Sequence, residues 1–79
     1  MLTDEQKEEI EEKFNHYSYL AEKNKRYLGY DDCSELYRRN IAIMEALREA
    51  LKVLGYAFEQ AHTEKHIGLE YWAYKLVKV

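Results

Sequence analysis

Residues 10–28 read IEEKFNHYSYLAEKNKRYL, and residues 37–54 read YRRNIAIMEALREALKVL. In both segments apolar residues, with an asparagine among them, recur at steps of three and four, which places them on one face of a helix. The two sets are Ile10, Phe14, Tyr17, Ala21, Asn24 and Leu28, and then Tyr37, Asn40, Met44, Leu47, Leu51 and Leu54. Because only a short link beginning at Gly29 separates the segments, we predict two antiparallel helices packed along these faces.

A specific register follows from folding the chain back at Gly29. The facing pairs are then Ile10 with Leu54, Phe14 with Leu51, Tyr17 with Leu47, and Asn24 with Asn40. Two asparagines that face each other in an apolar seam can hydrogen bond to one another and fix the register of the helices. In a second interpretation, the two amides line a polar pocket between the helices.

The ends of both helices carry local signals. Thr3 followed by Gln6 fits a capping box, and Gly29 suits the position just after a helix. Asp32 is the expected cap of the second helix, and Gly55 is its expected stop. The predicted helices therefore span residues 3–28 and 32–54.

The hydrophobic period changes after Gly55. Aromatic residues such as Trp72 and Tyr74 now alternate with other residues, a pattern typical of strands. We predict strands over residues 56–62 and 69–78, joined by a polar loop that ends at Gly68. This β-hairpin is expected to pack on the second helix and to cover apolar flanks of that helix, which are Leu36, Ile43 and Ala50 on one side and Ile41 on the other. The predicted fold is α+β: one domain, residues 1–79, in which an antiparallel two-helix hairpin is followed by a C-terminal β-hairpin.

An all-α fold is the alternative. Leu51, Leu54, Phe58 and Ala61 continue the helical spacing past Gly55, so the second helix could extend to about residue 62. Only a short strand or helix would then remain at the C-terminal end. We favour the β-hairpin, because a single strand would leave its backbone groups without partners.

The size and composition exclude several classes of protein. A chain of 79 residues with one cysteine builds one small core and no internal disulfide. Its sequence turns acidic at Asp4, directly after Thr3, and it has no apolar stretch long enough for a membrane span. We therefore expect a soluble cytoplasmic protein without a membrane partner. The contact between two helices buries little apolar surface, so a second subunit in a homo-oligomer could cover more of it.

Charge is distributed unevenly along the chain. The formal net charge is −3, which makes nucleic acid an unlikely partner. Folding at Gly29 creates an acidic end and a basic end. The acidic end contains Asp4, Glu5, Glu8, Glu9, Glu11 and Glu12. The basic end contains Lys23, Lys25, Arg26, Arg38 and Arg39. The acidic end is either a solvated helix face or a surface that mimics nucleic acid. The candidate partner-binding residues are Glu8, Glu9 and Glu12, together with Tyr71 and Trp72 on the predicted strands.

Eight tyrosines make up most of the aromatic residues. Several of them flank the predicted helix-helix turn beside arginines, a combination that suits an anionic, nucleotide-type ligand. The candidate ligand-binding residues are Arg26, Tyr27, Tyr30, Tyr37, Arg38 and Arg39. The alternative is that these rings cap the end of a thin core.

Motifs for catalysis or for a cofactor are missing. The chain has no glycine-rich phosphate loop and no nucleophile elbow, and the acidic neighbours of Cys33 oppose a thiolate. His62 and His66 are four residues apart but lack a third ligand for zinc. We therefore predict no catalytic residue, no metal site and no cofactor.

The chain resembles the small orphan proteins of phages and prophages. The resemblance rests on the capped acidic helix, the second helix ending Leu54-Gly55-Tyr56, and the aromatic tail that closes residues 74–79. It implies a non-catalytic protein that binds and inhibits or modulates a host protein, as anti-defence proteins do, often as a homo-oligomer. The alternative function is a small module that sequesters an anionic nucleotide-type ligand.

Overall fold

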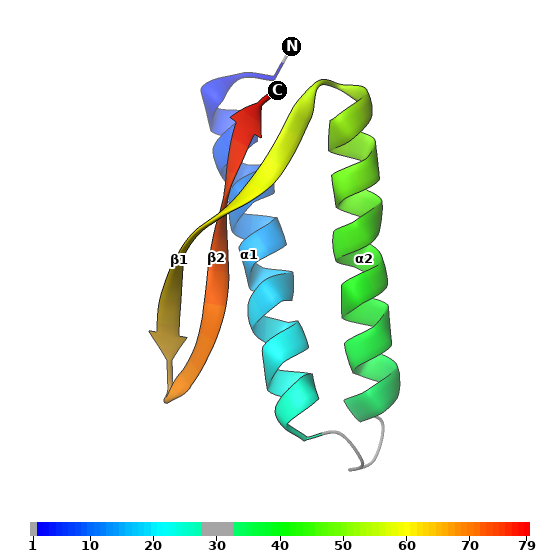
Figure 1. Ribbon diagram of the computed structural model, residues 1–79, viewed down its shortest axis with the longest axis vertical. Coiled ribbons are helices and arrows are strands. Elements are labelled where there is room, and N and C mark those ends of the chain that lie inside the picture. The colour runs from blue at the N-terminus through cyan, green and yellow to red at the C-terminus, as the bar shows by residue number, and fades with distance from the viewer. Residues whose placement is uncertain (1, 28–32) are drawn as a thin grey trace.

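Two helices are followed by two strands in the computed structural model, which describes residues 2–27 and 33–79. The elements are α1 (Asp4–Arg26), α2 (Cys33–Val53), β1 (Tyr56–His66) and β2 (Leu69–Lys78). Figure 1 shows the two helices side by side, with the hairpin crossing in front of α1. The α+β prediction is confirmed, and the all-α alternative is not realised, because residues 56–66 form a strand. No helix in the described part of the chain combines the length and apolarity that a bilayer span requires.

The predicted cap of α1 is confirmed in detail. The Gln6 backbone N–H donates to Thr3 Oγ1 at 3.1 Å, and the Thr3 backbone N–H donates to Gln6 Oε1 at 3.0 Å. Each bond satisfies a donor that the first helical turn would otherwise leave without a partner. Within the described residues, α1 begins one residue later than predicted, at Asp4, and α2 ends one residue earlier, at Val53. The predicted caps Gly29 and Asp32 lie outside the described residues.

Gly55 ends the second helix as predicted. Its φ of 87° lies in the left-handed region, where glycine avoids the steric cost of a Cβ. Its N–H donates to the Lys52 carbonyl at 3.0 Å, which closes the last turn. The chain then leaves α2 directly as β1, so two residues separate helix from strand.

The predicted strand 56–62 is four residues too short. β1 continues to His66, and the turn consists of Ile67 and Gly68 alone, with φ values of 50° and 76°. Positive φ at both positions is what the tight two-residue hairpin turns require. The polar residues 63–66, which predicted a loop, form a strand. The distal part of the hairpin is exposed to solvent, so polar side chains are tolerated there.

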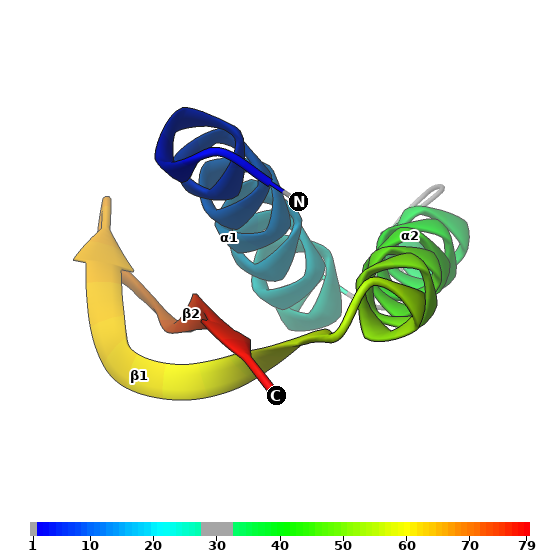
Figure 2. The same ribbon diagram turned by 90° about the horizontal axis from the view of Figure 1, so that it is seen from above.

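A β-bulge bends the hairpin. The antiparallel register pairs Gln60 with Tyr74 and His62 with Ala73, which leaves Ala61 as the extra residue. A bulge increases local twist, and Figure 2 shows β1 curving strongly around one side of α1. The buried residues of β2 are accordingly Leu69, Ala73 and Leu76, rather than every second residue.

The hairpin lies mainly along α1. β2 runs beside α1, and α2 meets the hairpin through β1. Asn15 pairs with the β2 backbone like a short piece of strand: its amide accepts from the Tyr74 N–H at 2.7 Å and donates to the Tyr74 carbonyl at 3.1 Å. Ser18 Oγ donates to the Trp72 carbonyl at 2.7 Å. The expected contact with α2 is present, but these bonds to α1 fix the position of β2.

Two adjoining clusters form the core. The first contains Phe14, Ala21 and Met44, with Tyr17 and Leu47 among the residues packed on it. The second contains Leu51, Tyr56 and Leu76, with Ile10 packed on it. Phe58 packs on both clusters, and so joins Phe14 to the part of the core that contains Leu51. The helices thus pack as antiparallel neighbours along the predicted faces.

The asparagine pair does not act as expected. Asn40 is buried and Asn24 is half-buried, but no hydrogen bond joins their amides. A direct bond between these side chains therefore does not set the register of the helices. The bonds from Asn15 and Ser18 to β2 supply the specific polar contacts instead.

One predicted role of the hairpin, to cover the flanks of the second helix, is wrong on one side of that helix. The Ile41 flank is half-buried and packs on the first cluster with Phe58 and Tyr74, as expected, but on the other flank Leu36 remains 39% exposed and Ala50 is exposed. The reason is geometric: β1 touches α2 on the side of Arg48, and Leu36 and Ala50 lie on the opposite flank of the helix. One side of the two-helix layer therefore has no cover from the hairpin.

Candidate functional site

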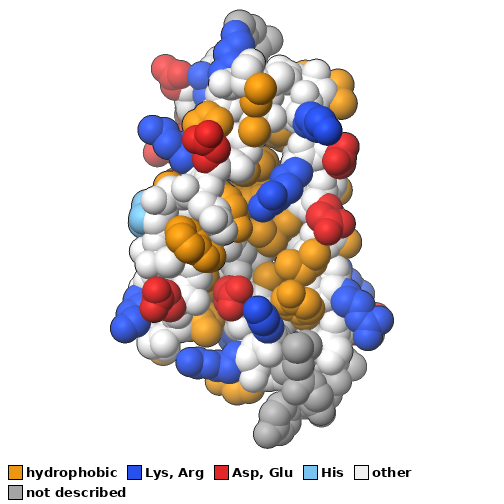
Figure 3. Space-filling view, in the orientation of Figure 1, with side chains coloured by type: hydrophobic (Ala, Val, Ile, Leu, Met, Phe, Trp, Pro, Cys, Tyr) orange, Lys and Arg blue, Asp and Glu red, His pale blue; other side chains and the backbone are white. Residues whose placement is uncertain are grey.

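An apolar groove lies between the hairpin and α2. Figure 3 shows hydrophobic side chains gathered along the middle of this face. We define the aromatic groove as Arg48, Phe58, Trp72 and Tyr74, with Phe14 as its floor. Towards the start of β1, Arg48 and Phe58 also line a hollow of about 420 Å³. Its other lining residues are Glu49, Lys52, Gly55, Tyr56, Ala57 and Val79.

Stacked rings make the floor of the groove rigid. Phe14 is fully buried, and its ring stacks on that of Phe58 with 3.8 Å between centroids and 8° between planes. The Tyr74 ring meets Phe14 edge-on at 5.1 Å and 89°. Aromatic pairs in both geometries are favourable beyond the area they bury. The groove is therefore preformed in the free protein.

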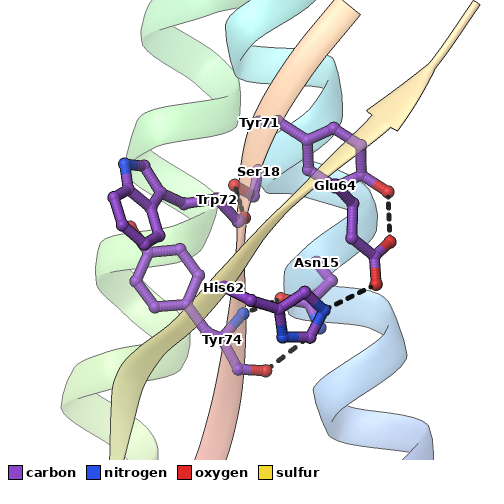
Figure 4. A network of polar contacts seen from close by, with 7 residues as sticks. All are labelled: Asn15, Ser18, His62, Glu64, Tyr71, Trp72 and Tyr74. Atoms are coloured by element: carbon purple, nitrogen blue, oxygen red, sulfur yellow. Dashed lines mark hydrogen bonds and ion pairs between the residues drawn. The ribbon is translucent and has the colours of Figure 1, made fainter.

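Trp72 lies beside Tyr74 at the edge of the groove, and it also lines a separate hollow with Glu22, Thr63, Glu70 and Tyr71. Its side chain is 43% exposed although it is the largest apolar group of the chain. Figure 4 shows the Trp72 and Tyr74 rings beside one another on the side of β2 that faces α2. Tryptophan is strongly enriched among the residues that contribute most to protein interfaces. A half-exposed tryptophan on a rigid strand is thus a ready contact for a partner.

Arg48 supplies the charge of the groove. Its Cζ lies 5.2 Å from the Phe14 centroid and 5.3 Å from the Tyr74 centroid. A guanidinium held against ring faces keeps its N–H groups available for a carboxylate. No carboxylate of the described residues lies within ion-pair distance of Arg48. The groove therefore offers an anion-binding group directly beside apolar surface.

A polar array occupies the other side of the hairpin (Figure 4). Glu64 Oε1 lies 3.0 Å from His62 Nε2, and the Tyr71 hydroxyl donates to Glu64 Oε2 at 3.0 Å. The Tyr19 ring contacts both Tyr71 and His66 edge-on, with centroids 5.4 Å and 5.2 Å apart. This array ties the distal half of the hairpin to α1.

The array shifts two pKa values. Hydrogen bonds from His62 and then from Tyr71 hold the pKa of Glu64 below its ordinary value. Burial, followed by the bond to Glu64, raises the pKa of Tyr71. The side chains of His62 and Glu64 remain 62% and 50% exposed. An exposed pair of this kind fits a structural role better than proton transfer, which an enzyme performs in a site shielded from water.

The described residues hold no group of three or more His, Cys, Asp or Glu side chains arranged for a metal ion. His62 and Glu64 would supply two ligands, fewer than a structural or catalytic zinc site uses. Cys33 is half-buried at the start of α2 and forms no disulfide.

The predicted ligand patch is divided between two places. Arg26 and Tyr27 line a hollow of about 220 Å³ at the tip of the hairpin, together with Tyr19, Lys23, His66, Ile67 and Leu69. Tyr37 packs on the core instead, and Arg39 forms an ion pair with Glu35 at 3.8 Å. Arg38 is exposed on α2 and does not line the hollow at the hairpin tip. Tyr30 lies outside the described residues.

The predicted partner-binding residues also fall on different surfaces. Glu8, Glu9 and Glu12 are exposed on α1. Glu9 and Glu12 border a hollow of about 520 Å³ along α1, which they share with Ile10, Lys13, His16 and Tyr17. Tyr71 and Trp72 are neighbours in sequence but point to opposite sides of β2 (Figure 4). Of the five, only Trp72 belongs to the aromatic groove.

Of the groove residues, the sequence identified only Trp72 as a candidate; it did not reveal Arg48, Phe58, Tyr74 or the floor residue Phe14 as parts of a site. Arg48 follows Leu47 on α2, so the helical period alone makes it a charged residue beside the seam. Its position over two rings depends on where the hairpin packs, which no local pattern specifies.

In comparisons with known proteins, no family model matches this chain, and neither a curated protein nor a solved structure matches it.

Proposed function

We propose that this chain is a non-catalytic interaction protein that binds a short segment of another protein in the aromatic groove. The observation that carries the proposal is the half-exposed Trp72 on the same rigid groove as Arg48, whose guanidinium has no carboxylate partner among the described residues. An apolar anchor would fill the space beside Trp72, and an Asp or Glu close to it would bind Arg48. The preformed floor lowers the ordering cost of binding.

The proposal also concerns the kind of protein that contains the bound segment. The resemblance to small phage proteins favours a host protein in the cytoplasm, and modulation or inhibition of that protein as the result of binding. An extended strand and a helix face are the common ways in which a partner presents such a segment.

A randomised peptide library displayed against the folded protein tests the proposal. We expect enrichment of sequences with a large apolar residue within a few positions of Asp or Glu. For a selected peptide, Trp72→Ala and Arg48→Ala should each weaken binding by tenfold or more, and Arg48→Lys should restore part of it. Ile67→Asn is the matched control, because Ile67 is an exposed apolar residue far from the groove, at the hairpin turn. Peptides that bind all variants equally would disprove the proposal.

A second candidate function is binding of a phosphate-bearing ligand at the hairpin tip. The hollow there joins three basic groups, Lys23, Arg26 and His66, to the rings of Tyr19 and Tyr27. Phosphate groups pair with arginine and lysine, and bases stack on aromatic rings. A nucleotide that binds the folded state would raise the melting temperature.

Two variants separate this site from the other arginines. Arg26→Ala should abolish a nucleotide-induced shift in melting temperature, whereas Arg38→Ala with Arg39→Ala should leave it unchanged, because these residues do not line the hollow. If a panel of nucleotides gives no shift with the parent protein, this second function is excluded.

A further inference from the structure

One side of the two-helix layer has no covering element. The hairpin packs on the flank of α1 that carries Asn15 and Ser18, and on the flank of α2 that carries Arg48. The opposite flanks together form what we call the helical face: Tyr17, Leu20, Leu36, Ile43, Leu47, Ala50 and Leu54. Leu54 is 59% exposed and Leu36 39%, and Ala50 is exposed between them. An apolar face of this extent marks an interaction site.

The exposed area has the size that a dimer would remove. The chain exposes 5852 Å², whereas a compact monomer of this mass exposes about 5,050 Å². The surplus of about 800 Å² equals what each partner buries in an interface of standard size. The radius of gyration, 13.3 Å, also exceeds the value of about 11.6 Å that is typical of a compact domain of this length. The monomer is therefore less compact than is typical of a domain of this length.

Charge is complementary between the two ends of the helical face. Glu9 and Glu12 border it near the N-terminal end of α1, beside the hollow that also contains Ile10 and Lys13. Arg39 borders it near the opposite end, where the N-terminal part of α2 lies. A two-fold axis perpendicular to the helices brings the acidic end of one copy against the basic end of the other. A parallel arrangement would place like charges together, which is unfavourable.

We infer that a second copy of this chain covers the helical face and forms an antiparallel, two-fold symmetric dimer. With this axis, α1 packs on α1 and α2 packs on α2 of the partner subunit with their ends exchanged, so Leu36 of each copy lies near Leu54 of the partner subunit. The four helices then form a bundle with both hairpins outside, so the two aromatic grooves stay open. The inference is independent of the proposed function, because the groove lies on the other side of the helices.

Light scattering on protein separated by size, over a range of concentrations, tests the dimer. We expect twice the 9.5 kDa mass of the chain. Leu36→Glu with Leu54→Glu should give a monomer that keeps the parent's circular dichroism, because both residues are exposed. The control Arg38→Glu, an exposed residue of α2 that is not part of the helical face, should remain dimeric. A parent protein that is monomeric at 0.5 mM, or a dimer that persists in the double variant, would overturn the inference.

Discussion

Phe14 shows how one residue links the core to the groove. Its buried ring packs on Phe58 and Tyr74 and lies beneath Arg48, so three elements meet on it. Its burial could be predicted, because it lies in the middle of an amphipathic stripe. Its stacking on Phe58 could not, because that contact depends on where the hairpin crosses the helices.

Replacing Phe14 tests this central position. Phe14→Ala should lower the free energy of unfolding by about 3–5 kcal/mol, because it removes ring contacts and leaves a cavity. In so small a domain this loss should unfold much of the population. Urea denaturation followed by circular dichroism measures the change, with Val53→Ala as the exposed control. A loss below 1 kcal/mol would contradict the packing described for Phe14.

The shifted pKa values of Glu64 and Tyr71 predict a pH dependence of stability. The folded pKa of Glu64 is depressed, so its contribution is present above the ordinary value of 4.5 and is lost as the pH falls through the folded pKa. The folded pKa of Tyr71 is raised, so its contribution is present below 10.0 and is lost as the pH rises through the folded pKa.

Glu64→Gln tests this dependence. The parent protein should melt higher than Glu64→Gln near pH 7, and the difference should shrink on acidification below pH 4.5. Melting curves at several pH values measure it. A difference that stays constant from pH 7 to pH 3 would show that the charge on Glu64 does not stabilise the hairpin.

At the scale of elements, periodicity predicted the helices well and the hairpin only in part. The steps of three and four in residues 10–54 correctly place α1 and α2, and the alternation around Trp72 correctly places β2. The distal part of β1 was predicted as a loop, because its residues are exposed to solvent and show no alternation of apolar and polar side chains. The contact between β2 and α1 was also missed: it depends on Asn15 and Ser18, two polar residues that carry no period.

The attachment of β2 to α1 gives a prediction at this scale. Asn15→Ala removes both hydrogen bonds to Tyr74 and should cost about 1–3 kcal/mol of unfolding free energy. It should also speed hydrogen exchange at the Tyr74 amide, which would lose its acceptor. Glu59→Ala, which replaces an exposed residue of β1, serves as the control. Unchanged exchange at Tyr74 would contradict the role of Asn15.

The turn between the two strands gives another prediction about stability. Ile67 has a φ of 50°, which costs a β-branched residue about 1–3 kcal/mol, and asparagine tolerates this region far better. Ile67→Asn should therefore raise the stability by about 1 kcal/mol, and Ile67→Val should not. Thermal melting distinguishes them, and a destabilised Ile67→Asn variant would argue against the two-residue turn.

At the scale of the whole molecule, the chain is a thin layer of helices with a hairpin on one side, 42 × 23 × 17 Å in extent. The polarity of its charges could be predicted from the sequence, because the helical hairpin brings distant acidic and basic runs to opposite ends. The aromatic groove could not, since its residues come from α1, α2, β1 and β2 and meet only in the folded chain. The two open surfaces of the molecule differ: one is a narrow groove with a single guanidinium, and the other is a broad apolar face.

Trp72 fluorescence tests the central claim, that the aromatic groove binds a protein segment. Because Trp72 is the one tryptophan of the chain, its emission reports on the groove alone. Titration with a selected peptide that lacks tryptophan should shift the emission to shorter wavelength and saturate, as the half-exposed ring leaves water. Binding of that peptide, detected by calorimetry, with no change in Trp72 emission would contradict the claim.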